Sequence, residues 1–102
     1  METGGATAVE EETQINLSPR YVVCLFDNDK STFEFIILLL QKVFHKTQEE
    51  AEAITMEIHE GGPQGHAVFI GSKEVCEFKL EQIKTFCDKY GDWYLKYEMR
   101  EA

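Results

Sequence analysis

Three short runs of apolar residues have the composition of β-strands. The first, Tyr21–Phe26, reads YVVCLF, and the second is His66–Ile70. Both are rich in the β-branched and aromatic side chains that favour strands. The third run, Trp93–Met99, alternates apolar with polar positions, which predicts a strand with one buried face. That face carries Trp93, Leu95, Tyr97 and Met99.

A helix is predicted directly after the first strand. Ser31 and Glu34 have the spacing of a capping box, with Ser31 as the N-cap, and the helix is expected to run to about Lys46. Apolar residues cover most of its surface, including the run Phe35–Leu40. A helix this apolar is expected to be covered on more than one side.

Two further helices follow. Thr47 and Glu50 form a second capping box, and the helix they begin is expected to stop near His59–Glu60, because the Gly-Gly-Pro sequence that follows cannot continue it. A third helix is predicted for Lys73–Tyr90. Its signals are an N-capping serine before it, a glycine after it and an apolar stripe along one face.

The predicted order of elements is β-α-α-β-α-β. It indicates an α+β fold in which a small, three-stranded, mainly antiparallel sheet packs on three helices. Residues 1–19 show no periodicity and almost no large apolar side chains, so we expect a disordered N-terminal tail. Residues 20–102 are expected to form one domain.

The charge of the chain narrows the possible partners. Its 102 residues include 10 Lys and Arg against 19 Asp and Glu, a net charge of -9. This balance argues against nucleic acid and anionic membranes. The longest apolar run is too short to span a membrane. Three cysteines without a CxxC spacing indicate a reducing, cytoplasmic compartment with free thiols. A binding module is favoured over an enzyme.

The turn Asp27-Asn28-Asp29 is the first candidate site. Such residues commonly stabilise their own turn, but two carboxylates and an amide can also accept the three N–H bonds of a primary ammonium. His59, at the end of the second helix, is the second candidate; the alternative is a helix-capping side chain. The spacing of His and Cys predicts no metal site.

The stretch from Tyr21 to Ile36 resembles the opening of the ClpS adaptor family: an apolar strand, an acidic turn and a helix that starts with apolar-Glu-Phe-Ile. Leu40–Phe44, the pair Ile58-His59 and the Glu77-x-Lys79 spacing continue the likeness. The similarity extends over about Tyr21 to Met99. The family consists of non-enzymatic adaptors that bind bulky hydrophobic N-terminal residues and hand the substrate to a Clp-type AAA+ unfoldase.

The resemblance implies roles for individual residues. The turn and His59 would bind the α-amino group of the substrate, Ser31 would contact it at the rim, and Phe33 would be the gatekeeper. Ile36, Thr55 and Ile58 would line the pocket, and Trp93 or Leu95 would close its floor. Glu77 and Lys79 would contact the N-terminal domain of the unfoldase, and the tail would assist delivery. The family needs no cofactor, and we expect a monomer. The substrate-binding set is Asp27, Asn28, Asp29, Ser31, Phe33, Ile36, Thr55, Ile58 and His59.

The chain departs from the family pattern at three of these positions. Asp27 stands where Asn is usual, while Phe33 and Thr55 replace common methionines. Two alternatives therefore stay open. One is an adaptor that docks on the unfoldase and modulates it without recognising an amine. The other is a small enzyme that uses Cys24 or Cys76 with a histidine.

Overall fold

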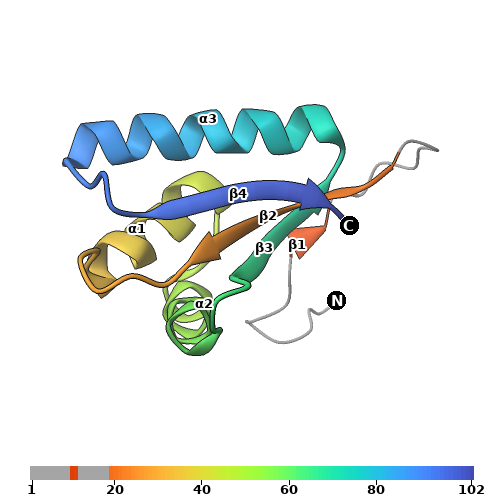
Figure 1. Cartoon of the computed structure of the whole chain (residues 1–102). Coiled ribbons are helices and arrows are strands. Elements are labelled where there is room, and N and C mark those ends of the chain that lie inside the picture. Colours follow the sequence, from red (N-terminus) through yellow and green to blue (C-terminus); the bar gives the residue numbers. More distant parts are fainter. Residues whose placement is uncertain (1–9, 12–18) are drawn as a thin grey trace.

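The computed structural model describes residues 10–11 and 19–102. It shows the predicted order β-α-α-β-α-β, preceded by one additional short strand (Figure 1). The strands are β1 (Glu10–Glu11), β2 (Tyr21–Phe26), β3 (His66–Gly71) and β4 (Lys96–Glu101). The helices are α1 (Phe33–Phe44), α2 (Gln48–Glu60) and α3 (Lys73–Tyr90).

The sheet has the strand order β1-β3-β2-β4. The central strand β2 is antiparallel to both β3 and β4, so the predicted three-stranded antiparallel sheet is confirmed. The two residues of β1 pair in parallel with Phe69 and Ile70 of β3 and were not predicted as a strand. Residues 1–9 and 12–18 of the expected tail lie outside the described part of the chain.

The core lies between the sheet and the three helices. In Figure 1, α3 runs along the sheet above it and α2 lies below it. Val23 and Leu25 of β2 are fully buried against Leu39 and Leu40 of α1 and Ile83 of α3. Helix α1 contacts both α2 and α3, which confirms that its broad apolar surface is covered on more than one side.

The first helix starts and ends one or two residues from the predicted positions. Thr32, not Ser31, is the N-cap, and its Oγ1 accepts a hydrogen bond of 3.1 Å from the backbone N–H of Phe35. Ser31 is held instead by the preceding turn. The helix ends at Phe44, because His45 adopts a left-handed conformation with φ of 59°. The second capping box, between Thr47 and Glu50, is confirmed.

The last strand begins later than its sequence pattern predicts. Oδ1 of Asp92 accepts hydrogen bonds from the backbone N–H groups of Tyr94 and Leu95, so the chain turns here before β4 starts at Lys96. Trp93 therefore does not join the buried face and is 71% exposed. Leu95, Tyr97 and Met99 do pack on the core.

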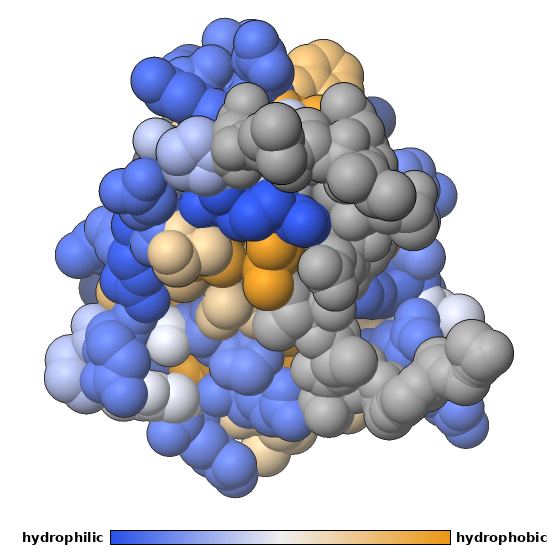
Figure 2. Space-filling model, turned by 90° about the vertical axis from the view of Figure 1, so that its right-hand side faces the viewer, coloured by the Kyte–Doolittle hydropathy of each residue, from blue (hydrophilic) through white to orange (hydrophobic). Residues whose placement is uncertain are grey.

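Among the described residues on the face that Figure 2 shows, most of the surface is hydrophilic, with a small apolar patch near the centre of the view. No helix in the described ranges is both long and apolar enough to cross a bilayer.

Candidate functional site

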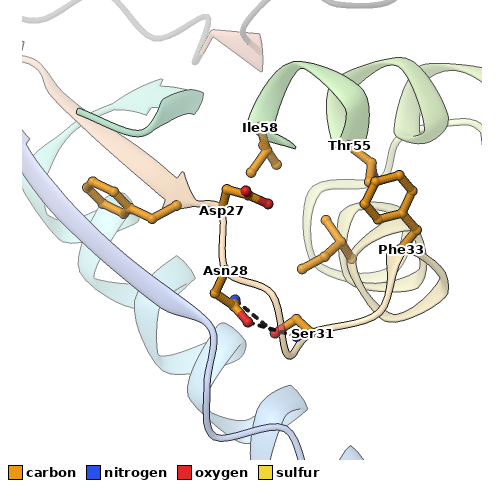
Figure 3. A pocket seen from close by; sticks show the side chains of 8 residues that line it. Asp27, Asn28, Ser31, Phe33, Thr55 and Ile58 are labelled. Carbon is orange, nitrogen blue, oxygen red and sulfur yellow. Dashed lines mark hydrogen bonds between the residues drawn. The ribbon is translucent and has the colours of Figure 1, made fainter. Parts of the chain in front are cut away.

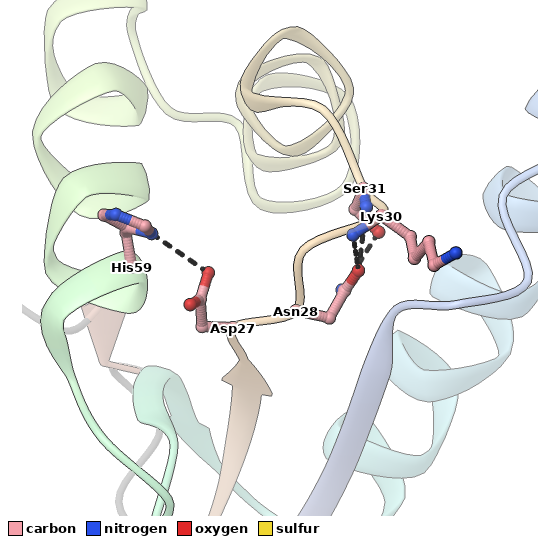
Figure 4. A network of polar contacts seen from close by, with 5 residues as sticks. All are labelled: Asp27, Asn28, Lys30, Ser31 and His59. Atoms are coloured by element: carbon pink, nitrogen blue, oxygen red, sulfur yellow. Dashed lines mark hydrogen bonds and ion pairs between the residues drawn. The ribbon is translucent and has the colours of Figure 1, made fainter.

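The turn after β2 is organised by the side chain of Asn28. Its Oδ1 accepts hydrogen bonds from the backbone N–H groups of Lys30, at 2.8 Å, and Ser31, at 2.7 Å. Its Nδ2 donates to Oγ of Ser31 at 3.0 Å (Figure 4). Asn28 and Ser31 thus use much of their hydrogen-bonding capacity on each other and on the backbone, and fix the path of the chain into α1.

Asp27 points away from this network, toward α2. Its Oδ1 lies 3.3 Å from Nδ1 of His59, which stands in the last turn of α2 (Figure 4). The two side chains are 38% and 50% exposed, respectively, so the pair is accessible to a ligand and contributes little to stability. Asp27 has further acceptor capacity beyond this contact, because an ionised carboxylate offers about four lone-pair sites.

The ring of His59 is also in contact with Phe33. The ring centroids are 5.3 Å apart and the planes meet at 69°, an edge-to-face arrangement. Phe33 is the first residue of α1 and is 42% exposed. The contact joins the start of α1 to the end of α2 beside the Asp27 carboxylate.

A small pocket lies between this turn and the two helices (Figure 3). Its lining side chains come from the end of β2, the turn, α1 and α2, and they are Phe26, Asp27, Asn28, Ser31, Phe33, Ile36, Thr55 and Ile58. The hydroxyl of Thr55 donates to the Ala51 carbonyl at 2.7 Å, so its proton is not offered to a ligand. The pocket is therefore apolar on the helix side and polar at the turn.

The pocket has a free volume of about 10 Å³, which is room for about one water molecule. A bulky side chain can enter only if a lining side chain moves. Phe33 is half-exposed and lies at a helix start, whereas Ile36, Thr55 and Ile58 are buried. Rotation of Phe33 is the least costly way to open the pocket.

Most of the residues that the sequence suggested for binding come together here. His59 does not line the pocket but contacts Asp27 at its edge. Asp29 is the exception, because it lies in the exposed turn outside the lining. Trp93 and Leu95, one of which was expected to close the floor, do not line this pocket; both line a separate hollow beside the end of α3.

Phe26 is the lining residue that sequence reasoning missed. Its ring is covered by Lys96, whose Nζ lies 4.7 Å from the ring centroid. It also lies against Gly65, where an added Cβ would come within 2.8 Å of Cε2 of Phe26. The sequence signal was a bulky aromatic residue at the last position of the strand, directly before the acidic turn.

Comparison with known proteins identifies the family. Residues 16–94 match the family model of the ATP-dependent Clp protease adaptor protein ClpS. The chain belongs to the ClpS adaptor family. The ClpS of Nautilia profundicola is 35% identical over 85 residues, which cover 83% of this chain and 86% of that protein. The ClpS of Paracidovorax citrulli is 34% identical over 89 residues, covering 86% of this chain and 71% of the relative.

A solved structure confirms the ClpS fold. Agrobacterium tumefaciens ClpS2, bound to L-phenylalaninamide, superposes with a TM-score of 0.72 at 22% identity, covering 84% of this chain and all of that one. The relatives are described as adaptors of the Clp protease, which is consistent with a non-enzymatic role.

Of the two residues that the ClpS resemblance assigns to the unfoldase contact, Glu77 is exposed and Lys79 is turned inward. Nζ of Lys79 donates to the carbonyl of Val43 at 2.8 Å, and it lies 5.4 Å and 5.6 Å from the ring centroids of Phe44 and Phe69. Lys79 therefore ties the end of α1 to α3 and the sheet.

The three cysteines of this ClpS-family chain are free and buried. Burial raises the pKa of Cys24, and it raises the pKa of Cys87 to about 11. Sγ of Cys76 lies 3.5 Å from the Tyr21 carbonyl. Buried thiols that stay protonated are poor nucleophiles, which counts against the enzyme alternative. Within the described ranges, no group of three or more His, Cys, Asp or Glu residues is placed to hold a metal ion.

Proposed function

We propose that this adaptor recognises the N-terminal residue of its substrates, through a free α-amino group and a bulky hydrophobic side chain, and delivers them to a Clp-type AAA+ unfoldase. The observation that carries this proposal is the Asp27 carboxylate, paired with His59 at the edge of a pocket whose helix side is apolar. An α-ammonium requires acceptors and a negative charge, and an apolar side chain requires a dry surface.

The chemistry of the site suits such a ligand in detail. Asp27 is the only ionisable side chain in the described pocket lining. A hydrogen bond to a charged group contributes about 1.5–3 kcal/mol, and burial of a large apolar side chain about the same. Micromolar binding corresponds to about 8 kcal/mol, so it requires more than one such hydrogen bond in addition to this burial. L-phenylalaninamide, the ligand of the Agrobacterium relative, combines a free amine with a benzyl group.

The proposal is tested by fluorescence anisotropy with labelled short peptides that start with Phe, Leu, Trp or Arg. Each peptide is compared with its N-acetylated form. Binding of the bulky apolar peptides that acetylation abolishes supports the proposal. If no free-amine peptide binds at high micromolar protein, the amine-recognition hypothesis is overturned. The alternative hypothesis, an adaptor that docks on the unfoldase without recognising an amine, is then favoured.

The three unpaired thiols fit a reducing compartment such as the cytoplasm, where we place this adaptor.

A further inference from the structure

The hollow beside the end of α3 has a volume of about 220 Å³ and shares no residue with the pocket at the turn. We call it the Trp93 hollow; its lining residues lie between Lys84 and Tyr97 and come from the last turns of α3, the loop that follows and β4. Sites for small molecules are usually larger, with volumes of about 300–1,000 Å³. A hollow of this size suits one long side chain of a partner better than a cofactor.

The indole of Trp93 forms an exposed but fixed wall of the hollow. It is 71% exposed, and its Nε1 donates a hydrogen bond of 3.1 Å to Oδ1 of Asp88. Cys87 and Leu95 are buried, and they form the apolar floor of the hollow. An aromatic ring that is held in place before binding loses little conformational freedom when a partner packs on it, which favours its use as an interface anchor.

Two carboxylates give the hollow its negative charge. Oδ2 of Asp88 lies 3.3 Å from Nζ of Lys84, the one cation among the described lining residues. The hydrogen bond from Trp93, followed by the one from Lys84, lowers the pKa of Asp88, so this carboxyl is ionised at neutral pH. Oδ1 of Asp92 accepts hydrogen bonds from two backbone N–H groups of the loop, and its Oδ2 accepts none from a described residue. An aromatic face beside carboxylates favours a guanidinium or an ammonium group.

The hollow lies at the same end of the molecule as the proposed amine site. In Figure 1 the loop between α3 and β4 is at the same end as the turn between β2 and α1. The two segments are in contact, because Nζ of Lys30 in the turn lies 5.6 Å from the ring centroid of Tyr94, the residue after Trp93. The next residue of the turn, Ser31, lines the pocket. An extended peptide covers about 3.3 Å per residue, so a few residues lead from the pocket to the hollow.

We propose that the Trp93 hollow is a second subsite for the substrate, and that it takes an arginine or lysine side chain a few residues after the N-terminal residue. The cation packs on the indole and faces the carboxylates of Asp88 and Asp92. The methylene groups of the same side chain cover the apolar floor. The net charge of -9 adds attraction for a basic segment at longer range. The inference rests on the proposed function for the identity of the partner as a substrate.

The ammonium of Lys84 already occupies part of this subsite. Its pair with Asp88 is exposed, with 70% of the Lys84 side chain accessible, so the pair contributes little to stability and can be exchanged for the cation of a ligand. Lys84→Gln is therefore expected to strengthen the contribution of a basic substrate residue. An unchanged or weaker contribution in this variant would contradict the exchange.

The first test measures the affinity of Phe-initiated peptides by fluorescence anisotropy. One arginine is moved through positions 3 to about 8 of a Gly-Ser chain, and glutamine at the same position is the reference. Arginine at one or two adjacent positions is expected to strengthen binding by about threefold to tenfold, as for a cation–π contact combined with an exposed ion pair.

Asp88→Asn and Trp93→Ala are expected to remove this gain and to leave the affinity of the glutamine peptides unchanged. Glu74→Gln and Phe78→Ala are the matched charge and aromatic controls on α3. Both residues are exposed and neither lines the hollow, so both variants should retain the gain from arginine.

The second test uses the intrinsic fluorescence of Trp93, the only tryptophan of the chain. An N-acetylated, tryptophan-free peptide that carries the arginine is expected to change this fluorescence at millimolar concentration in the parent, and much less in Asp88→Asn. The matching glutamine peptide should leave it unchanged. Because these peptides have no free amine, this test does not depend on amine recognition.

The outcomes separate the subsite from the proposed function. Glutamine peptides that bind through a free amine, without a gain from arginine at any position, overturn the subsite and leave amine recognition standing. A gain that persists in Asp88→Asn and Trp93→Ala also overturns it, because general attraction by the net charge then explains the gain. Failure of every free-amine peptide overturns the proposed function and the substrate as the partner, whereas unchanged Trp93 fluorescence with the arginine peptide overturns the hollow as a site.

Discussion

Nδ1 of His59 lies 3.3 Å from Oδ1 of Asp27, and this contact joins the last turn of α2 to the end of β2. Because Asn28 is engaged with the turn, the carboxylate of Asp27 is the acceptor in the pocket lining that we propose for a ligand ammonium. His59 holds this carboxylate at the edge of the pocket.

Asp27→Asn is expected to weaken binding of free-amine peptides by about 10-fold to 100-fold, the equivalent of one charged hydrogen bond. The substitution keeps the shape of the side chain and removes its charge. Asp29→Asn is the control, since Asp29 has the same charge two residues away but does not line the pocket. Anisotropy with a Phe-initiated peptide measures both; an equal loss in the two variants would contradict a specific role for Asp27.

Thr32→Ala is expected to lower the free energy of unfolding by about 1 kcal/mol, because it removes the N-cap acceptor of α1. Ser31→Ala, the position that the sequence pattern favoured as the cap, removes one side-chain contact with Asn28 and is expected to cost less. Urea unfolding of the two variants decides between the positions. A larger loss for Ser31→Ala would show that the turn, not the cap, controls this helix start.

Ser31 and Thr32 show which details of the fold can be predicted from the sequence and which cannot. Thr32 and Ser31 are adjacent and chemically alike, and only the path of the turn, set by the Asn28 side chain, decides which one caps α1. Capping boxes with one clear candidate, such as Thr47 with Glu50, were predicted correctly. The strands and helices followed from periodicity, which reports local structure well.

The positions of two aromatic side chains, Trp93 and Phe26, were harder to predict. Trp93 matched the alternation of the last strand, yet Asp92 turns the chain there and the indole Nε1 donates to Asp88 at 3.1 Å in the exposed region. Phe26 lines the pocket because Gly65 and Lys96, far apart in sequence, enclose its ring. The Asp92 turn is local but competes with the alternating pattern of the strand, whereas the enclosure of Phe26 has no local signal in the chain.

Gly65→Ala is expected to destabilise the protein by more than 1 kcal/mol or so. Gly65 has φ of 78°, which L side chains rarely adopt, and its added Cβ would lie 2.8 Å from the ring of Phe26. To relieve this clash the ring of Phe26 would have to shift. Because Phe26 lines the pocket, the shift would alter the pocket wall, and peptide affinity should fall as well. Gly62→Ala is the matched control, since it has the same φ of 78° but more open space. Urea unfolding and anisotropy together separate strain from the clash: a loss of affinity equal in both variants would argue against the role of Phe26.

The buried thiols predict a specific sensitivity to alkaline pH. The pKa of Cys87 is raised from 9.0 to about 11 by burial, with the Asp92 and Asp88 carboxylates adding to the shift. The unfolded chain therefore loses this proton first as the pH rises. The stability is fully present below pH 9, and about 1–2 kcal/mol of it should be lost by pH 11. The raised pKa of Cys24 acts in the same direction.

Cys87→Ala should make the decline in unfolding free energy between pH 9 and pH 11 shallower than in the parent, although its stability at pH 7 is lower because of the lost packing. Urea midpoints measured at several pH values give this slope.

A thiol-reactive dye at pH 8 gives an independent readout. The native chain should react slowly with the dye, and the urea-unfolded chain should react at all three cysteines. Rapid reaction of one thiol in the native state, with kinetics that follow a histidine titration, would restore the enzyme alternative. An unchanged slope in Cys87→Ala would instead mean that other groups, such as Tyr97, whose pKa burial also raises, govern the alkaline transition.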